Sequence, residues 1–492
     1  MNPFTEVWTV LAGVAVTFLS ILALQRYRSR RKLPPGPRGV PFLGNATQIR
    51  FDDLINEFKR LRAKYGDIFS FKVFGQPVIV ANGYESIRQL LITEADSISD
   101  RPGKLAEDNP HQLGIAASSG PLWKEHRSFG LKTLRQFGFG KQSVEIQIQE
   151  EVIDFLNDIN DTNEKPFNIH DFLAASISNI ICSMAFGKRF EHSDRRLLKL
   201  LDFINDNLSD SNRIADIFVP FLDWLPGDPL NRKSRLARIT EVKAFLKEII
   251  EEHRNTLDEN HKRDYIDTFL IQQNNDRETE NSTFTDEQLL HTLVEFFIAG
   301  SETTTTTLRW ATLYLIHNPD VQAGMRKEID DVIGSSRMPN LTDKPLLPYC
   351  EAVISEVQRI RTVVPFSVPH YVKNDVHCQD YVIPKGAIVF PNLYSVAMDT
   401  ENFPNPDKFD PTRFLENGEK KSEKAKIAPF SIGRRACLGE SLAKSELFLF
   451  LTSLIQRFEL LPEDMKVLPS TEGILGATYS PKPFKIRAIS RV

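Results

Sequence analysis

Cysteine is scarce in this chain, which has only four in 492 residues and no C-x-x-C pair. Disulfide-built domains are rich in cysteine, and structural zinc sites usually draw on closely spaced cysteine pairs. The sequence therefore disfavours a disulfide framework and a structural zinc site, and it fits a reducing compartment. The four are Cys182, Cys350, Cys378 and Cys437.

An excess of positive charge is also missing, because 61 basic residues face 65 acidic ones and the net charge is −4. That balance gives no reason to expect a nucleic-acid partner. The chain lacks a G-x-G-x-x-G dinucleotide fingerprint, an internal repeat and a low-complexity boundary between domains. Its 41% hydrophobic and 26% charged residues are ordinary for a globular protein and exclude a disordered chain.

A long hydrophobic run stands in the first 33 residues. Residues 7–24 carry no charge over 18 positions, about the minimum for a helix that spans a bilayer core. A basic stop-transfer stretch follows at 26–32, so the positive-inside rule predicts a signal anchor in 1–33 with a lumenal N-terminus and a cytosolic body. A cleaved signal peptide is the alternative, but its basic leading segment and small-residue cleavage site are missing. A proline-rich hinge would lead into one catalytic domain spanning 34–492.

The remainder predicts a mostly α fold with a small β region, which is the α+β class. Two strands are expected around a turn at Gly75, within residues 67–81, and further strands within 381–392. The charged, polar stretch 255–286 is interpreted as solvated loops between helices. We expect long helices to make up most of the body.

One predicted helix is unusual in composition. After Thr285, a candidate N-cap, residues 289–320 are apolar nearly all round for about nine turns, which predicts a buried central helix. Its middle holds a run of five threonines, 303–307, although helices prefer Ala or Leu. Small residues on one face would let a flat molecule lie close to the backbone, while a tight helix crossing with back-bonded threonines is the alternative. The residues sharing that face are Ala299, Gly300, Thr303 and Thr304.

The stretch 430–439, FSIGRRACLG, places one cysteine in a basic loop between glycines. Thiolate is the reactive form of cysteine, and nearby arginines and N–H groups directed at sulfur favour it. The stretch matches the pattern F-x-x-G-x-R-x-C-x-G, which is rare by chance. The matching residues are Phe430, Gly433, Arg435, Cys437 and Gly439.

This loop resembles the haem-binding loop of the cytochrome P450 family, the haem-thiolate monooxygenases. Other motifs occur in that family's order: AGSETT at 299–304 resembles its oxygen-activating segment, EVQR at 356–359 its E-x-x-R helix, and FDPTRF at 409–414 the loop that joins this helix. Residues 134–145 resemble the second family of animal microsomal members. The resemblance covers essentially the whole chain, anchor and hinge included.

The resemblance implies that Cys437, as thiolate, ligates the iron of haem b, with Phe430, Gly433, Gly439, Ala299 and Gly300 bordering the haem. It also implies a set of residues that contact the haem propionates. These are Trp123, Arg127, His370, Arg435 and, from a less similar loop, Arg101. For His370 a satisfied surface histidine is the alternative.

Two further sets of residues come with the resemblance. Glu302 and Thr303 resemble the acid and alcohol that supply protons during oxygen activation. Glu356, Arg359 and Arg413 resemble a buried ion network, although a Glu and an Arg at this spacing alone would usually form a surface pair.

Electrons must come from another protein, because the chain has no dinucleotide fingerprint and is too short for an added flavin domain. The resemblance implies NADPH–cytochrome P450 reductase, with cytochrome b5 as a second partner, at the endoplasmic reticulum membrane. A basic run could dock an acidic partner or form an ordinary solvated surface. It comprises Lys124, Lys132, Arg135, Lys141 and Arg434.

The substrate is expected to be lipophilic: a fatty acid, a steroid or a xenobiotic. By resemblance the pocket is lined from 105–117, 203–221, Phe296, Phe297, Ala299, 363–367 and 474–477, and the apolar stretch 217–227 would dip into the bilayer. A haem-thiolate isomerase or dehydratase that rearranges peroxides is disfavoured by the presence of both Thr303 and Glu302. A catalytically silent haem-binding protein is disfavoured because every motif is intact.

Overall fold

The computed structural model describes residue 13 and residues 33–103, 109–138, 142–208, 232–416, 419–420 and 427–491. Nearly all of the predicted anchor and the whole of the predicted membrane-dipping stretch 217–227 lie outside these residues. Within them, one helix, α7 (Ile169–Phe186), is long and apolar enough to span a membrane, but 78% of it is buried inside the protein. That burial is typical of a core helix.

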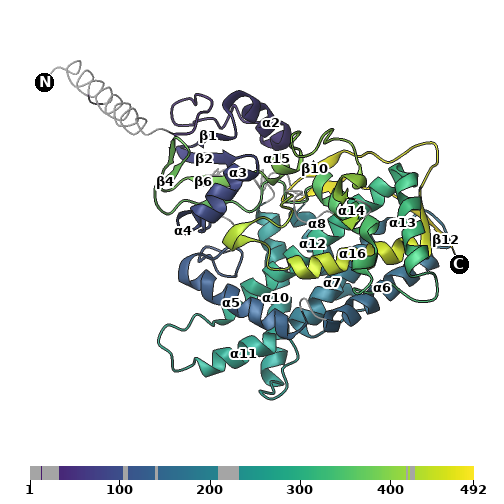
Figure 1. Cartoon of the computed structure of the whole chain (residues 1–492). Coiled ribbons are helices and arrows are strands. Elements are labelled where there is room, and N and C mark those ends of the chain that lie inside the picture. The colour runs from purple at the N-terminus through teal and green to yellow at the C-terminus, as the bar shows by residue number, and fades with distance from the viewer. Residues whose placement is uncertain are drawn as a thin grey trace, which may run out of the picture.

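Small sheets stand beside a large helical body, which confirms the α+β prediction (Figure 1). The largest sheet has four strands in the order β1-β2-β6-β3. Strands β1 (Ile68–Val73) and β2 (Gln76–Ala81) form an antiparallel hairpin, as the 67–81 pattern predicts. Strand β6 (Ile388–Pro391) pairs parallel to β2, and β3 (His370–Tyr371) pairs antiparallel to β6. The sheet thus joins two distant parts of the chain.

Four two-stranded sheets complete the β structure within the described residues. One of their strands, β5 (Tyr381–Ile383), falls within 381–392, where the sequence predicts strands. The pairs are β4 (Val376–Cys378) with β5 (Tyr381–Ile383), β7 (Leu415–Glu416) with β8 (Glu419–Lys420), β9 (Phe458–Pro462) with β12 (Ile486–Ser490), and β10 (Gly473–Leu475) with β11 (Tyr479–Pro481).

Helix α12 (Asp286–His317) runs through the middle of the helical body (Figure 1). The side chain of Thr285 accepts a hydrogen bond from the N–H of Gln288, so the predicted N-cap is confirmed. Packing against α7 and α16 (Glu440–Arg457) buries most of α12, as its apolar surface predicts. The other helices are α2 (Leu54–Tyr65), α3 (Tyr84–Arg88), α4 (Ala95–Ile98), α5 (Gly120–Gln136), α6 (Gln142–Asp161), α8 (Arg195–Leu208), α10 (Arg232–Asn255), α11 (Tyr265–Asn275), α13 (Pro319–Val332), α14 (Pro348–Ile360) and α15 (Leu393–Ala397).

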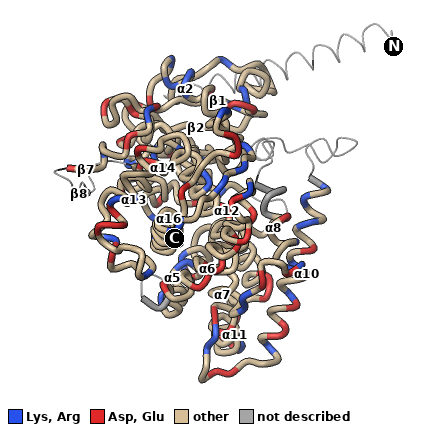
Figure 2. Tube along the Cα trace, turned by 90° about the vertical axis from the view of Figure 1, so that its right-hand side faces the viewer, with Lys and Arg blue, Asp and Glu red and all other residues tan. Residues whose placement is uncertain are grey.

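The prediction of solvated loops over 255–286 is wrong for its middle part, which forms α11. Tyr265, Ile266 and Phe269 are fully buried on this helix. Asp264 caps it by accepting a hydrogen bond from the N–H of Asp267 at 2.9 Å. Polar residues on both sides mask this short apolar segment in the sequence. Figure 2 shows that the neighbouring α10 instead carries basic and acidic residues in alternation, as a solvated helix does.

Candidate active site

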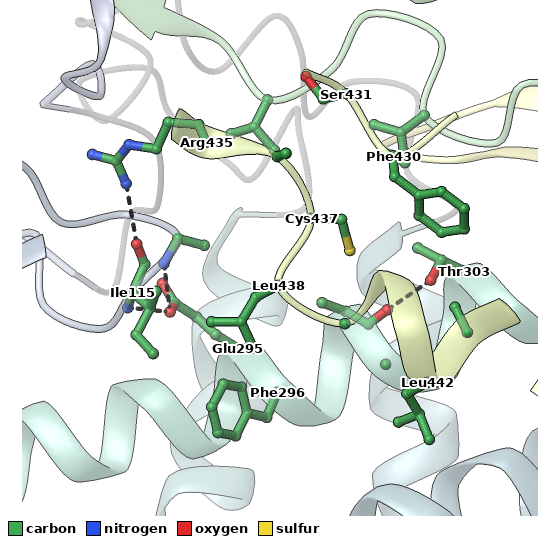
Figure 3. Close-up of a pocket in the computed structure, with 18 of the residues that line it drawn as sticks. Ile115, Glu295, Phe296, Thr303, Phe430, Ser431, Arg435, Cys437, Leu438 and Leu442 are labelled. Atoms are coloured by element: carbon green, nitrogen blue, oxygen red, sulfur yellow. Dashed lines mark hydrogen bonds between the residues drawn. The ribbon is translucent and has the colours of Figure 1, made fainter. Parts of the chain in front are cut away.

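Cys437 extends into a cavity of about 320 Å³ beneath α12. Figure 3 shows its sulfur pointing into the space between its own loop and the helix. The loop is closed by a hydrogen bond from the N–H of Cys437 to the carbonyl of Phe430 at 2.9 Å. Helix α16 begins three residues later, so the sulfur lies just before a helix N-terminus.

The two glycines of the cysteine motif serve different purposes. Gly433 has φ of +80°, and a Cβ there would lie 2.2 Å from the carbonyl oxygen of Leu91 in the π-helical turn η2 (Gln89–Thr93). Gly433 is not among the described residues that border the cavity. Gly439 does border it, and its N–H donates a hydrogen bond to the Cys437 sulfur. A glycine is therefore needed at position 433 for the packing of the loop, and the expectation that Gly433 borders the haem is not supported by the cavity lining.

Burial raises the pKa of the Cys437 thiol, and the Gly439 N–H and Arg127 offset this only in part. Cys437 is accessible through the open cavity. The sequence predicts that nearby arginines and N–H groups favour the thiolate, and Gly439 and Arg127 have this effect. The two arginines of the motif are engaged elsewhere, since Arg434 pairs with Asp96 at the surface and Arg435 donates to backbone carbonyls. Coordination to a metal would deprotonate the thiol.

Three arginines meet at one end of the cavity, of which Arg101 and Arg435 are buried and Arg127 is half-buried. Arg435 donates hydrogen bonds to the carbonyls of Ser118 (2.6 Å) and Ile115 (3.2 Å), and its guanidinium lies 4.0 Å from the ring centre of Trp123. Arg101 donates to two carbonyls at 2.9 Å, and Arg127 to that of Ala436 at 2.6 Å.

Positive charge predominates at this end of the cavity, so the site favours binding of an anion. Burial, followed by the charge of Arg101, lowers the pKa of Arg435 to about 8, and burial lowers that of Arg101 to about 9. Such shifts mean that the nearby carboxylates do not balance the positive charge. The buried Nε1 of Trp123 has no hydrogen-bond partner among the described residues. The site thus offers several donors to a negatively charged group.

His370 is buried, so it is not a surface histidine. Its Nδ1 lies 2.8 Å from the carbonyl oxygen of Ile98, and Nε2 has no partner in the part of the chain that the structure describes. Burial and the charge of Arg101 lower its pKa well below the ordinary value. It stands beside the arginines without bordering the cavity.

The predicted small-residue face of α12 forms one wall of the cavity. Ala299, Gly300, Thr303 and Thr304 all border it. The hydroxyl of Thr303 donates to the carbonyl of Ala299 at 2.8 Å, so the back-bonded arrangement and the cavity-facing one occur together.

A family profile described as Cytochrome P450 matches residues 34–488 of this sequence. The chain belongs to the cytochrome P450 family. Members bind haem b through a cysteine thiolate and receive NADPH-derived electrons from reductase partners, so this protein is a cytochrome P450 monooxygenase. The buried arginines and the unpartnered Trp123 N–H suit the carboxylates of haem, and the apolar walls suit its macrocycle.

Individual relatives agree with the family match over nearly the full length. Cytochrome P450 2H2 of Gallus gallus is 40% identical, with 98% of this chain and 99% of the relative covered. Cytochrome P450 2C23 of Rattus norvegicus is 38% identical with the same coverage, and cytochrome P450 2C8 of Homo sapiens is 36% identical over 99% of each chain. These names confirm the resemblance to the second family.

Glu302 of this P450 faces away from the cavity that Thr303 borders. Its carboxylate accepts a hydrogen bond from the Thr306 hydroxyl at 2.7 Å, one turn along α12. Burial raises its pKa. Successive helical residues point about 100° apart, so neighbours in sequence do not share a face. The predicted acid and alcohol are therefore adjacent in the chain but not hydrogen-bonded to each other.

Glu295 borders the cavity and is absent from the sequence prediction. Its carboxylate accepts hydrogen bonds from the N–H groups of residues 115, 116 and 117 at 2.6, 2.8 and 3.0 Å (Figure 3). Burial raises its pKa to about 7, although these N–H groups and Arg101 lower it. Gly114, with φ of +87°, leaves room for the carboxylate. An acid inside the apolar run VEFF is the one signal that could have identified it.

The cavity wall departs from the sequence prediction elsewhere too. Phe296 borders the cavity, whereas Phe297 is buried against Phe186, and 474–477 contribute no described lining residue. Most of 203–221 lies outside the described residues. Lining residues that the prediction missed include Leu134, Ile181, Met184, Leu438, Leu442 and Glu446.

The Glu356, Arg359 and Arg413 side chains form one network beneath the site. Arg359 donates to both carboxylate oxygens of Glu356, at 2.7 and 2.8 Å, and both residues are fully buried. Arg413 adds a third hydrogen bond at 3.2 Å. Arg359 also donates to the carbonyls of Ala397 and Pro406. This pair is therefore not at the surface.

Proposed function

We propose that Cys437 holds haem b in this cavity and that the enzyme hydroxylates lipophilic molecules at the endoplasmic reticulum membrane. The observation that carries the proposal is that one apolar cavity is bordered both by Cys437 and by three arginines, two of them buried and one half-buried. Haem b would need a thiolate for its iron and donors of positive charge for its two propionates, and the residues around this cavity would supply both.

The arginines would exchange neutral partners for charged ones when haem is present. Arg101, Arg127 and Arg435 now donate to backbone carbonyls. A carboxylate makes the stronger acceptor, because charge-assisted hydrogen bonds are roughly twice as strong as neutral ones. Trp123 Nε1 would donate as well, and an anion near His370 would favour its protonated form.

When bound, haem supplies the iron that activates dioxygen for the reaction RH + O2 + NADPH + H+ → ROH + H2O + NADP+. The chain must supply protons to this chemistry. Thr303 would orient a water molecule by turning its hydroxyl from the Ala299 carbonyl toward the cavity. Glu302 would hold the proton that passes to that water. A monooxygenase needs this pair, whereas an isomerase does not.

The substrate class follows from the lining of the cavity. Ile115, Phe296 and Val364 present apolar surface toward the space above Cys437. Such walls favour fatty acids, steroids or xenobiotics over polar metabolites. The loop that carries Ile115 is held by Glu295, which fixes one side of the substrate space.

Electrons would come from NADPH–cytochrome P450 reductase, with cytochrome b5 as a second donor. The hydrophobic run 7–24 would anchor the chain once in the endoplasmic reticulum membrane, N-terminus lumenal and catalytic domain cytosolic. Basic residues of α5, including Lys124 and Arg135, could bind an acidic face of the reductase.

The test uses the full-length protein with reductase in lipid vesicles. Fatty acids, steroids and drugs are screened for a ligand-induced change of the Soret band, and positive compounds are tested for turnover. We expect consumption of NADPH and dioxygen with formation of a hydroxylated product. Turnover of hydroperoxides without NADPH would instead favour an isomerase. In Cys437→Ser the long-wavelength Soret band of the reduced carbon monoxide complex should be lost, and its survival would assign the ligand elsewhere.

A further inference from the structure

The Glu302 carboxyl group lies in a small cluster of hydroxyl groups on the side of α12 that faces strand β11. Thr306 Oγ1 donates to Glu302 Oε1 at 2.7 Å, and Thr306 Oγ1 lies 3.4 Å from Ser480 Oγ. Thr478 Oγ1 lies 3.2 Å from Ser480 Oγ and extends the row by one hydroxyl.

Two hydrogen bonds fix Ser480 against the helix. Trp310 Nε1 donates to the carbonyl of Tyr479 at 2.8 Å, and Arg309 Nη2 donates to the carbonyl of Pro481 at 3.2 Å. These bonds hold β11 on both sides of Ser480. The contact between Ser480 and Thr306 is therefore part of the packing of β11 on α12, not a chance approach of two mobile side chains.

The solvent exposure of the side chains differs along this row of hydroxyl groups, from Glu302 through Thr306 to Ser480. Thr306 is fully buried and Glu302 is nearly so. Ser480 is only half-buried, in the β10–β11 hairpin, where the neighbouring Ile474 is exposed. The hairpin is thus the end of the row nearest to solvent, and Glu302 is the inner end.

Burial and nearby polar groups act on the Glu302 carboxyl group in opposite directions. Burial raises its pKa, while the Thr306 hydrogen bond, the charge of Arg309 and the nearby Ser480 hydroxyl lower it. Arg309 in turn is near Asp171 of α7, and burial lowers the pKa of Arg309. Burial is the largest of these influences, so the net effect is a raised pKa for Glu302.

We propose that Ser480 and Thr306 form the route by which the buried Glu302 takes up its proton from solvent. This inference rests on the proposed role of Glu302 as the proton source for Thr303. A hydronium ion gives a proton to Ser480 as Ser480 passes its own to Thr306 and Thr306 passes its own to the Glu302 carboxylate. The products are water and a carboxylic acid, and the hydroxyls reset by rotation. Thr478 keeps the Ser480 hydroxyl oriented, so Thr306, Ser480 and Thr478 are positioning residues.

Substitution of Thr306 gives the most specific test of the route. Thr306→Val keeps the shape of the side chain but removes the hydroxyl, and Thr306→Ser restores it. Thr305→Val is the matched control, because the Thr305 hydroxyl is equally buried on the same helix and has no partner among the described residues. Product per NADPH, hydrogen peroxide release and the solvent deuterium isotope effect on turnover are measured for each.

We expect Thr306→Val and Ser480→Ala to form less product per NADPH, release more hydrogen peroxide and show a larger solvent isotope effect. The loss should be smaller than the about 10²-fold typical of removing an acid–base group itself, since water can partly replace a hydroxyl. Thr306→Ser and Thr305→Val should match wild type. If Thr306→Val couples normally while Glu302→Gln does not, this route is wrong and the role of Glu302 stands. Normal coupling in Glu302→Gln would overturn that role instead.

A second readout needs no turnover. The infrared band of the protonated Glu302 carboxyl group is identified by its absence in Glu302→Gln of the resting enzyme. Thr306→Val should move this band, because a hydrogen bond to the carboxyl group is lost. After transfer into D2O, the band should shift more slowly in Ser480→Ala than in wild type. An unchanged exchange rate would show that protons reach Glu302 by another path.

Discussion

Thr304 on α12 donates a hydrogen bond of 3.0 Å to Oε2 of Glu446 on α16, which joins the cavity wall to the helix that follows Cys437. The other carboxyl oxygen of Glu446 has no partner among the described residues. Burial raises the pKa of Glu446 to about 8, with the Thr304 hydrogen bond opposing it. The group is therefore an uncharged acid at neutral pH.

Replacing Glu446 with Gln should preserve folding, because Gln is the neutral isostere and keeps an acceptor for Thr304. In wild type the folded state holds the Glu446 proton more tightly than the unfolded state, so unfolding free energy falls as pH rises from the ordinary value toward about 8. Glu446→Gln should lessen that fall, which urea unfolding at several pH values measures. Glu446→Ala should lose about 1–3 kcal/mol from the unsatisfied Thr304 hydroxyl. An unchanged pH slope in Gln would mean that Glu446 is ionised in the folded protein.

Thr303→Ala should uncouple the reaction without loss of haem. Thr304 cannot replace the missing hydroxyl, since it is engaged by Glu446. NADPH oxidation should continue while more hydrogen peroxide and less product form, with a loss below the about 10²- to 10⁴-fold range of acid–base groups. A side-by-side titration of NADPH, peroxide and product checks this, with Thr303→Ser as the control. If Thr303→Ala forms as much product per NADPH as wild type, then Thr303 only packs the helix.

Arg359→Ala should destabilise the fold by about 3–5 kcal/mol, because it leaves the buried Glu356 charge uncompensated. Arg413 alone, with one hydrogen bond to Glu356, cannot restore the lost pair. Haem per chain and the urea midpoint measure the effect. Arg434→Ala is the control, since its partner Asp96 is exposed and pairs at the surface contribute little to stability. Equal midpoints in the two variants would contradict the prediction.

His253 should make stability depend on pH in the opposite way from a paired acid. Burial alone would lower its pKa, but its hydrogen bond to Asp264 at 2.7 Å and the charge of Asp264 raise it. The stabilisation is thus complete below the ordinary pKa of about 6.5 and is lost as pH rises through the folded value. Melting temperatures between pH 6 and 9 should show this fall, and Asp264→Asn should lessen it, leaving the part that comes from Glu446. His261 is exposed, so His261→Gln is the control. A pH profile of Asp264→Asn identical to that of wild type would refute the pairing of His253 with Asp264.

His253 and Asp264, together with Asp267, are close enough to one another to suggest a metal site. The hydrogen bonds of these residues favour ion pairs with protein groups over binding of a metal ion. Nδ1 of His253 is directed at the Ile249 carbonyl and Nε2 at Asp264, while Asp267 accepts two hydrogen bonds of 2.7 Å from Arg263. Each ligand atom is already used within the protein.

Local sequence signals predicted the parts of the site that lie on one element. Thr285 and the apolar run after it determine where α12 begins, and the spacing of Ala299 and Thr303 determines their common face. The motif around Cys437 likewise fits within ten residues. These features depend on helix period and loop chemistry, which neighbouring residues encode.

Contacts between distant segments could not be predicted in this way. Glu295 binds residues 115–117, and Glu446 binds Thr304, so each acid has a purpose only once the fold brings its partner close. Helix phase also turned Glu302 away from Thr303, although the two are adjacent in sequence. The short helix α11 was hidden because its buried residues are few and their flanks are polar.

The close approach of Gly433 to the Leu91 carbonyl has a consequence for biosynthesis. Chains fold from the N-terminal end as they leave the ribosome, and this contact unites a turn made early with a loop made near the end of 492 residues. The loop that carries Cys437 therefore packs in part against a turn that must already be in place. The nascent protein should acquire its cofactor only after synthesis is nearly finished, because the loop that carries Cys437 is among the last parts of the chain to be made.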